Sequence, residues 1–253
     1  MTNELSDATK TEDLLKINLI TSTTEKEVQD DVVATETDEH LEYDPAVDKI
    51  LDGFKCFKTN YFNTHPELFN ELALGQNPKF LVFACSDSRV SPSHVLHFQP
   101  GDAFLVRNIA NLVPKFDQIR YSGTGATLEY AVEELGVENI LVMGHSGCGG
   151  IKRLMSYPED GSAPLMFIDD WVEMGLPVKT KVIAEQGNTD FLEQCESCAK
   201  GCINMSLDNL LTYPFVQKAY SEKKLALTGG YYDFFNGRFE LWEFGTNIII
   251  TTP

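Results

Sequence analysis

Short apolar runs alternate with segments of helical periodicity along most of this chain. Residues 128–135, for example, place their apolar side chains on one face of a helix. The apolar runs have the length of buried strands, and they lie at 80–83, 103–106, 139–143 and 225–228. Because strands that alternate with helices usually form a parallel sheet covered by those helices, we expect an α/β fold with a mostly parallel sheet flanked by helices.

Further helices are expected at both ends of this pattern. Residues 45–58 carry apolar side chains at helical spacing and predict an amphipathic helix. Residues 151–203 are polar with helical character, and a separate helix is expected over 204–211, ending before Pro214.

The first 44 residues differ from the rest in composition. They are rich in Glu, Asp and Thr and poor in aromatic residues, which predicts an acidic tail that is disordered or loosely attached. The short apolar piece at 14–20 leaves a helix or a docking segment open as the alternative. Residues 45–253 are expected to form one folded domain.

Charge and hydropathy exclude two classes of function. The formal net charge is −18, and residues 1–48 hold 14 acidic residues against three lysines. Nucleic acid is therefore not an expected partner, because phosphate binding needs clustered Lys and Arg. No apolar run reaches the eighteen or so residues of a membrane-spanning helix.

Two short motifs at predicted strand ends carry the candidate chemistry. Residues 84–89 read Ala-Cys-Ser-Asp-Ser-Arg, and residues 144–150 read Gly-His-Ser-Gly-Cys-Gly-Gly. Ligand sites in open α/β sheets form at the carboxyl ends of the strands. Two thiols and one imidazole, from Cys85, His145 and Cys148, suit zinc and leave a fourth position open. Taken one at a time, these residues could equally be buried core residues.

The two motifs resemble those of the β-class carbonic anhydrases, and the surrounding sequence resembles the plant-type branch of that family. The similarity extends from about Ile50 to about Trp242. Further stretches that resemble this branch lie at 93–96, 98–101, 106–111, 210–215, 229–234 and 239–242.

The resemblance implies a carbonic anhydrase, a zinc lyase that interconverts CO₂ and bicarbonate by attack of zinc-bound hydroxide. Cys85, His145 and Cys148 would hold one Zn²⁺ per subunit. Asp87, which could otherwise form an ordinary surface ion pair with Arg89, would orient the hydroxide while Arg89 keeps it ionised. Relatives in which this Asp closes onto the metal carry Trp three residues before the first Cys. Val82 stands there in this chain, so we expect the open form.

The resemblance also implies a substrate pocket. Gln76 would donate its amide hydrogen bond to a substrate oxygen, whereas alone it would be a loop residue before a turn. Phe104, Ile109 and Tyr130 would form an apolar wall, although core packing explains such residues equally well. Gly149 would present a backbone N–H near the metal.

Partners follow from the same resemblance. In this family the pocket lies between subunits, so a homodimer is the expected minimum unit and an octamer is possible. The helix at 45–58 is expected to pack on the partner subunit.

Six cysteines favour a metal site in a reducing compartment, because no apolar signal segment is present. We expect a cytoplasmic location, or a plastid one if a transit peptide has been removed. Cys195, Cys198 and Cys202 are expected to be free surface thiols on a helix, with a structural zinc site or redox sensitivity as alternatives.

Two other functions remain open on sequence grounds. One is a non-catalytic zinc protein that senses or binds a ligand. The other is a hydrolase of the same fold that acts on CS₂, which would differ in the shape of its access tunnel.

Overall fold

The structure is a computed structural model that describes residues 44–158, 160, 162, 164–246 and 248–252. The chain divides into two units, Met1–Tyr61 and Phe62–Pro253. The expected acidic tail lies outside the described residues except for Asp44. In the first unit the described part is helix α2 (Pro45–Asn60) with its two flanking residues.

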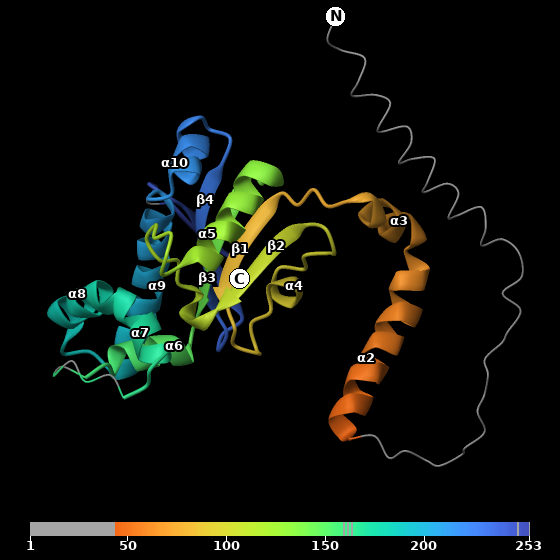
Figure 1. Cartoon of the computed structure of the whole chain (residues 1–253). Coiled ribbons are helices and arrows are strands. Elements are labelled where there is room, and N and C mark those ends of the chain that lie inside the picture. The colour runs from red at the N-terminus through yellow and green to blue at the C-terminus, as the bar shows by residue number, and fades with distance from the viewer. Residues whose placement is uncertain (1–43, 159, 161, 163, 247, 253) are drawn as a thin grey trace, which may run out of the picture. The chain divides into compact units, whose positions relative to one another are not determined.

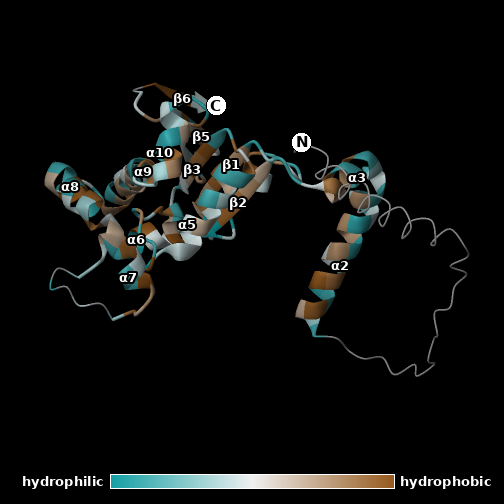
Figure 2. Ribbon diagram, turned by 45° about the horizontal axis from the view of Figure 1, so that its top comes forward, coloured by the Kyte–Doolittle hydropathy of each residue, from teal (hydrophilic) through white to brown (hydrophobic). Residues whose placement is uncertain are grey.

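Helix α2 confirms the helix predicted over residues 45–58. The Asp44 carboxylate accepts a hydrogen bond from the Ala46 N–H at 2.9 Å, and Pro45 occupies the first turn, where it removes no helical hydrogen bond. None of its residues is buried within the chain. Figure 2 shows hydrophobic positions recurring along it, among them Ile50 at 71% and Phe54 at 62% exposed.

In the second unit the described residues form one mixed sheet (Figure 1). The strand order is β2-β1-β3-β4-β5-β6; the first four strands run parallel, and the last two pair antiparallel. The strands are β1 (Phe80–Cys85), β2 (Ala103–Asn108), β3 (Asn139–His145), β4 (Ala226–Asp233), β5 (Arg238–Glu243) and β6 (Ile249–Thr252).

Helices connect and cover the strands, and α6, α7 and α8 gather near one end of α9 (Figure 1). Among the described residues of this unit they are α3 (Pro66–Leu74), α4 (Pro92–Val95), α5 (Ser122–Glu129), α6 (Gly149–Met155), α7 (Ile168–Val172), α8 (Leu176–Gln186), α9 (Phe191–Leu210) and α10 (Pro214–Ser221). A π-helical segment, Tyr130–Glu134, continues α5, and a 3₁₀ turn, Ile109–Asn111, follows β2.

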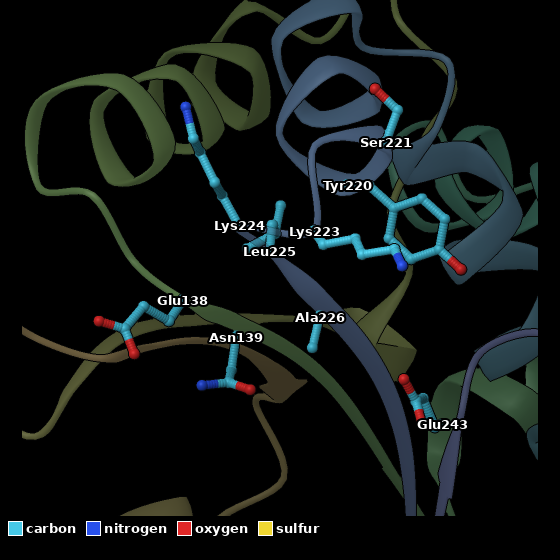
Figure 3. Close-up of a pocket in the computed structure, with 9 residues that line it drawn as sticks. All are labelled: Glu138, Asn139, Tyr220, Ser221, Lys223, Lys224, Leu225, Ala226 and Glu243. Atoms are coloured by element: carbon cyan, nitrogen blue, oxygen red, sulfur yellow. The ribbon is translucent and has the colours of Figure 1, made fainter.

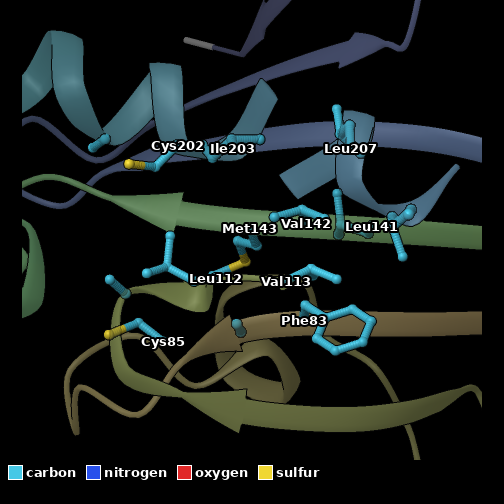
Figure 4. Packing of buried hydrophobic residues seen from close by; sticks show 14 of the residues in the cluster. Phe83, Cys85, Leu112, Val113, Leu141, Val142, Met143, Cys202, Ile203 and Leu207 are labelled. Carbon is cyan, nitrogen blue, oxygen red and sulfur yellow. The ribbon is translucent and has the colours of Figure 1, made fainter. Parts of the chain in front are cut away.

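The core lies between the parallel strands and α9. Four successive residues of β1, from Leu81 to Ala84, are 0% exposed, because both faces of a central parallel strand are covered. Figure 4 shows Ile203 and Leu207 of α9 beside Val142 of β3. The predicted fold class and the four predicted strands are therefore confirmed.

The structure corrects the helix boundaries in the second half of the chain. The predicted helical region 151–203 is three separate α-helices followed by most of α9, and α9 runs unbroken through the predicted boundary at 203 and 204. Both sides of that boundary are held by the same core: Ile203 and Leu207 are each 0% exposed. Helical periodicity alone did not show that one buried face continued across it.

Strands β5 and β6 were not predicted. The residues of β5 mix charged with apolar side chains and are mostly half-buried, and β6 is short and exposed, so neither has the pattern of a buried strand. Pairing with β4 and then with each other creates them. No helix in the described part of the chain combines the length and the hydrophobicity needed to cross a bilayer.

Candidate metal centre

The three predicted ligands come together at the carboxyl ends of two neighbouring strands. Cys85 ends β1, His145 ends β3, and Cys148 precedes the first residue of α6. Because β1 and β3 pair in parallel, their ends lie at the same edge of the sheet. The ligand atoms of the three residues lie within 4.8 Å of one another, and all three residues are buried.

The two thiols form a coupled pair. The Sγ atoms of Cys85 and Cys148 are 3.8 Å apart and share a hydrogen bond. That bond lowers the pKa of Cys85 to about 4, although burial opposes the shift, and the same bond raises the pKa of Cys148. Two thiolates this close would repel each other, so a cation bound between them would favour the deprotonated form of both.

The hydrogen bonding of the His145 ring leaves one nitrogen, Nε2, as the candidate metal ligand. Nδ1 of His145 lies 2.9 Å from the carbonyl oxygen of Ser146, and a carbonyl can only accept, so Nδ1 carries the proton. Nε2 is then an acceptor, and it is buried without a hydrogen-bond partner. An unpartnered buried nitrogen next to two thiols fits a metal ion, and the S₂N donor set fits zinc.

Asp87 and Arg89 form the predicted pair beside the first ligand. Arg89 donates from Nε to Oδ1 of Asp87 at 2.9 Å and from Nη2 to Oδ2 at 2.7 Å. These bonds hold the pKa of Asp87 well below its usual range. Within the described residues the mutually close donor set excludes Asp87, an arrangement consistent with the expected open form.

Two residues that the sequence reasoning did not single out support this pair. Arg107 donates from Nε to the Cys85 carbonyl at 2.9 Å and from Nη2 to the Asp87 carbonyl at 2.6 Å. The ring of Phe234 lies under the Arg89 guanidinium, with its centroid 4.6 Å from Cζ. Both residues fall within stretches that resemble the family, but only the tertiary structure shows what they contact.

Ser146 is a third residue that the sequence reasoning passed over. Besides its carbonyl contact with His145, its Oγ accepts the Phe234 N–H at 2.8 Å, and its own N–H donates to Tyr232 at 3.0 Å. The end of β4 and the turn that follows it therefore hold the backbone that orients the imidazole.

Ile109 and Gly149 lie near the centre. A Cβ placed on Gly150, in the first turn of α6, would come within 2.6 Å of Ile109 Cγ2, so Ile109 lies against the helix that follows Cys148. Its side chain is 39% exposed. Gly149 begins α6 and has open space where a side chain would be.

Gln76, Phe104 and Tyr130 are not brought to the centre within one chain. Phe104 pairs with Leu81, four residues before Cys85, which is about 13 Å along the strand. Tyr130 stacks near Phe104 at 5.9 Å between ring centroids. Gln76 is exposed and precedes the start of β1, at the strand end opposite to Cys85. Their pocket roles stay predictions.

The cysteines of α9 are not the surface thiols that the sequence analysis expected. Cys195 is 7% exposed, and Cys198 and Cys202 are 0% exposed, because they lie on the face of α9 that packs into the core. Burial raises the pKa of Cys195 to about 11, and a hydrogen bond with Cys198 raises that of Cys202. Thiols in this state react poorly.

One cavity lies apart from the predicted ligands, and a second one borders two of them. A cavity of about 810 Å³ opens at the start of β3 and β4, the opposite edge of the sheet, and Figure 3 shows Asn139, Lys223 and Lys224 around it. Its lining contains no Cys or His. A smaller cavity of about 200 Å³ lies between α9 and the residues that follow β3, and His145 and Cys148 form part of its wall.

Comparison with known proteins agrees with this geometry. Residues 80–239 match the family model described as "Carbonic anhydrase". The chain is 52% identical over 213 residues to Beta carbonic anhydrase 3 of Arabidopsis thaliana, a match that covers 82% of each protein.

Solved structures give the same result. The structure of the β-carbonic anhydrase CcaA superposes with a TM-score of 0.71 at 30% identity, covering 78% of this chain and 95% of that one. A tetrameric β-carbonic anhydrase from the filamentous ascomycete Sordaria macrospora superposes with a TM-score of 0.70 at 30% identity, covering 83% of this chain and 100% of that one. The buried Cys85–His145–Cys148 cluster, the mixed sheet and these matches lead to one conclusion: the chain belongs to the β-carbonic anhydrase family.

Proposed function

We propose that Cys85, His145 and Cys148 bind one Zn²⁺ per subunit and that the reversible hydration of CO₂ to bicarbonate takes place beside them. The observation that carries this proposal is the unpartnered Nε2 of His145, buried between two thiols and next to the Asp87–Arg89 pair. A bound Zn²⁺ would supply a water whose pKa is lowered to near neutral.

The residues around the centre orient the attacking water and favour an uncharged substrate. Asp87 stays ionised because Arg89 binds both of its oxygens, so its remaining lone pairs can accept a hydrogen bond from the attacking water. Accepting that bond points the water oxygen toward the carbon of CO₂. Ile109 provides an apolar surface, which suits a substrate without charge.

We further propose that the working unit is at least a homodimer. Gln76, Phe104 and Tyr130 lie toward the other end of β1 from Cys85, so a second copy would have to supply them to the pocket. The exposed apolar side chains of α2, such as Ile50 and Phe54, would pack on that copy. Assembly into an octamer stays a prediction.

Stopped-flow CO₂ hydration by the zinc-loaded protein, with a pH indicator, tests the reaction. We expect a rate far above background that is lost on chelation and restored by Zn²⁺. A background rate with zinc bound would reject catalysis of CO₂ hydration and favour a zinc-containing binding protein. Activity on CS₂ in place of CO₂ would favour the hydrolase.

Mixing two inactive variants tests the shared pocket. Gln76→Ala and Cys148→Ala chains are unfolded together and refolded as a mixture. If each pocket draws Gln76 from one chain and Cys148 from the other, mixed dimers contain one intact site, and about a quarter of all sites recover activity. No recovery, with dimers present by light scattering, would show that each pocket is built from one chain.

A further inference from the structure

An ion pair with a fully buried carboxylate links the helix after Cys148 to the rest of the fold. Arg153 of α6 donates from Nε and Nη2 to the two carboxylate oxygens of Asp169 in α7, at 2.5 and 2.6 Å. The Asp169 side chain is 0% exposed and that of Arg153 is 24% exposed. Asp169 also accepts the Leu165 N–H at 2.9 Å. A bidentate contact of this kind fixes the relative orientation of the two side chains as well as the distance between them.

Helix α6 is the element whose position matters most to Cys148. Cys148 directly precedes Gly149, the first residue of α6, and its carbonyl oxygen accepts the Lys152 N–H at 3.0 Å. Any rotation or shift of α6 therefore moves Cys148 with it.

Helix α7 also contacts the 3₁₀ turn Ile109–Asn111, which lies against α6. Trp171 donates from Nε1 to the Ile109 carbonyl at 2.8 Å. Ile109 and Ala110 in turn lie so close to Gly150 that a Cβ there would come within 2.6 and 3.0 Å of them. The short helix α7 is therefore bonded to α6 through Asp169 and to the 3₁₀ turn after β2 through Trp171.

We propose that Asp169 is a positioning residue for the metal centre. Its carboxylate holds Arg153, and so α6, in the orientation that presents Cys148 beside Cys85 and His145. This role rests on the proposed function only in that the Cys85–His145–Cys148 trio binds a metal. Among the described residues, the hydrogen-bond partners of the Asp169 carboxylate are Arg153 and Leu165, so Asp169 acts on the ligands through other residues.

The test compares Asp169→Asn with Asp170→Asn. Asp170 is the next residue of the same helix, but its side chain is 58% exposed and its partner, Arg120, lies outside α6. Zinc affinity is measured by competition with a chromophoric chelator, and Co²⁺ is bound to each protein to record its ligand-field and thiolate charge-transfer bands. For Asp169→Asn we expect zinc affinity to fall by about tenfold to a hundredfold, with shifted cobalt bands. Asp170→Asn should match the wild type.

The cobalt spectrum separates positioning from simple stabilisation. Asp169→Asn with a lowered melting temperature but with wild-type cobalt bands and zinc affinity would overturn the proposal. An equal change in Asp170→Asn would also overturn it. If Asp169→Asn does not fold, Arg153→Lys decides by the same criteria, since Lys keeps the charge but not the two-pronged geometry.

These measurements do not depend on catalysis. A wild-type protein that binds neither Co²⁺ nor Zn²⁺ would overturn the metal site itself. A wild-type protein that binds both metals but does not hydrate CO₂ would reject the catalytic part of the proposed function. In that case the cobalt spectra and zinc affinities of the variants would still decide whether Asp169 is a positioning residue.

Discussion

Single residues determine whether a metal can be held and whether the site can react. The trio of Cys85, His145 and Cys148 supplies two sulfurs and a nitrogen with no other buried partner, so each removal leaves too few donors. Asp87 differs, because it lies outside the donor set and is bound by Arg89. Substitutions at the two kinds of position should therefore give different phenotypes.

Cys148→Ala is expected to remove zinc and activity together. The remaining Cys85 and His145 offer two donors, fewer than the three found in catalytic zinc sites. Zinc content by atomic emission and the CO₂ hydration rate measure both effects. Cys198→Ala, also buried but outside the donor set, is the matched control and should keep its zinc. Full zinc content in Cys148→Ala would contradict the assignment.

Asp87→Asn is expected to keep zinc and lose rate. The amide has nearly the shape of the carboxylate, but it is neutral and it presents a donor where an acceptor is needed. A loss of about 10²-fold in kcat is expected when the attacking water is no longer held in its reactive orientation. Equal zinc content with a rate close to wild type would disprove the role of Asp87.

Elements place these residues at a common edge. β1 and β3 end together because they are parallel neighbours, and α6 starts directly after Cys148 with its first turn pressed against Ile109 and Ala110. The α6 contact is close enough to require glycine at position 150, where a Cβ would lie 2.6 Å from a carbon of Ile109. The adjacent Gly149 has no such neighbour.

Gly150→Ala is expected to destabilise the fold, whereas Gly149→Ala is not. The added methyl must displace Ile109 and the Ala110 backbone, and overpacking of this kind costs about 1–3 kcal/mol of unfolding free energy. Chemical denaturation of the two variants, compared by their midpoints at equal slope, measures the difference. Equal midpoints for both variants would show that the α6 contact yields easily.

At the scale of the whole molecule, stability and assembly depend on contacts between distant segments. The Arg153–Asp169 pair joins two helices separated along the chain, and β5 and β6 extend the sheet after the last parallel strand. Gln76, Phe104 and Tyr130 lie far from the metal ligands within one chain, so their predicted pocket roles depend on a second copy. The cellular compartment and the octamer stay predictions.

Asp169 is expected to make stability sensitive to acid. The hydrogen bonds from Arg153 lower the pKa of Asp169, so the folded state favours its ionised form. That stability is fully present above the unfolded pKa, about 3.9, and is lost as pH falls through the lower pKa of the folded state. Melting temperatures between about pH 5 and pH 3 should fall more steeply for the wild type than for Asp169→Asn. An equal dependence of melting temperature on pH in the two proteins would contradict a lowered pKa of Asp169.

Deletion of residues 1–43 is expected to leave the zinc content and the CO₂ hydration rate of the remaining chain unchanged. Their composition predicts that they bury little apolar surface, and the metal ligands all lie beyond residue 84. The same assays applied to the shortened chain check this. A large loss of rate with zinc retained would show that the apolar piece at 14–20 contributes to assembly.

The amino-acid sequence by itself determined the fold class, the four parallel strands and the three candidate ligands. Buried parallel strands are continuous apolar runs, so local pattern was enough for the strands, whereas the resemblance of the two motifs to a known family was needed to single out the ligands. The tertiary structure decided which cysteines are buried, where α9 begins and ends, the strands β5 and β6, and the contacts of Arg107, Phe234 and Asp169. Those features depend on contacts between segments that are far apart in the chain. The periodicity of one segment does not show which other segment it will contact.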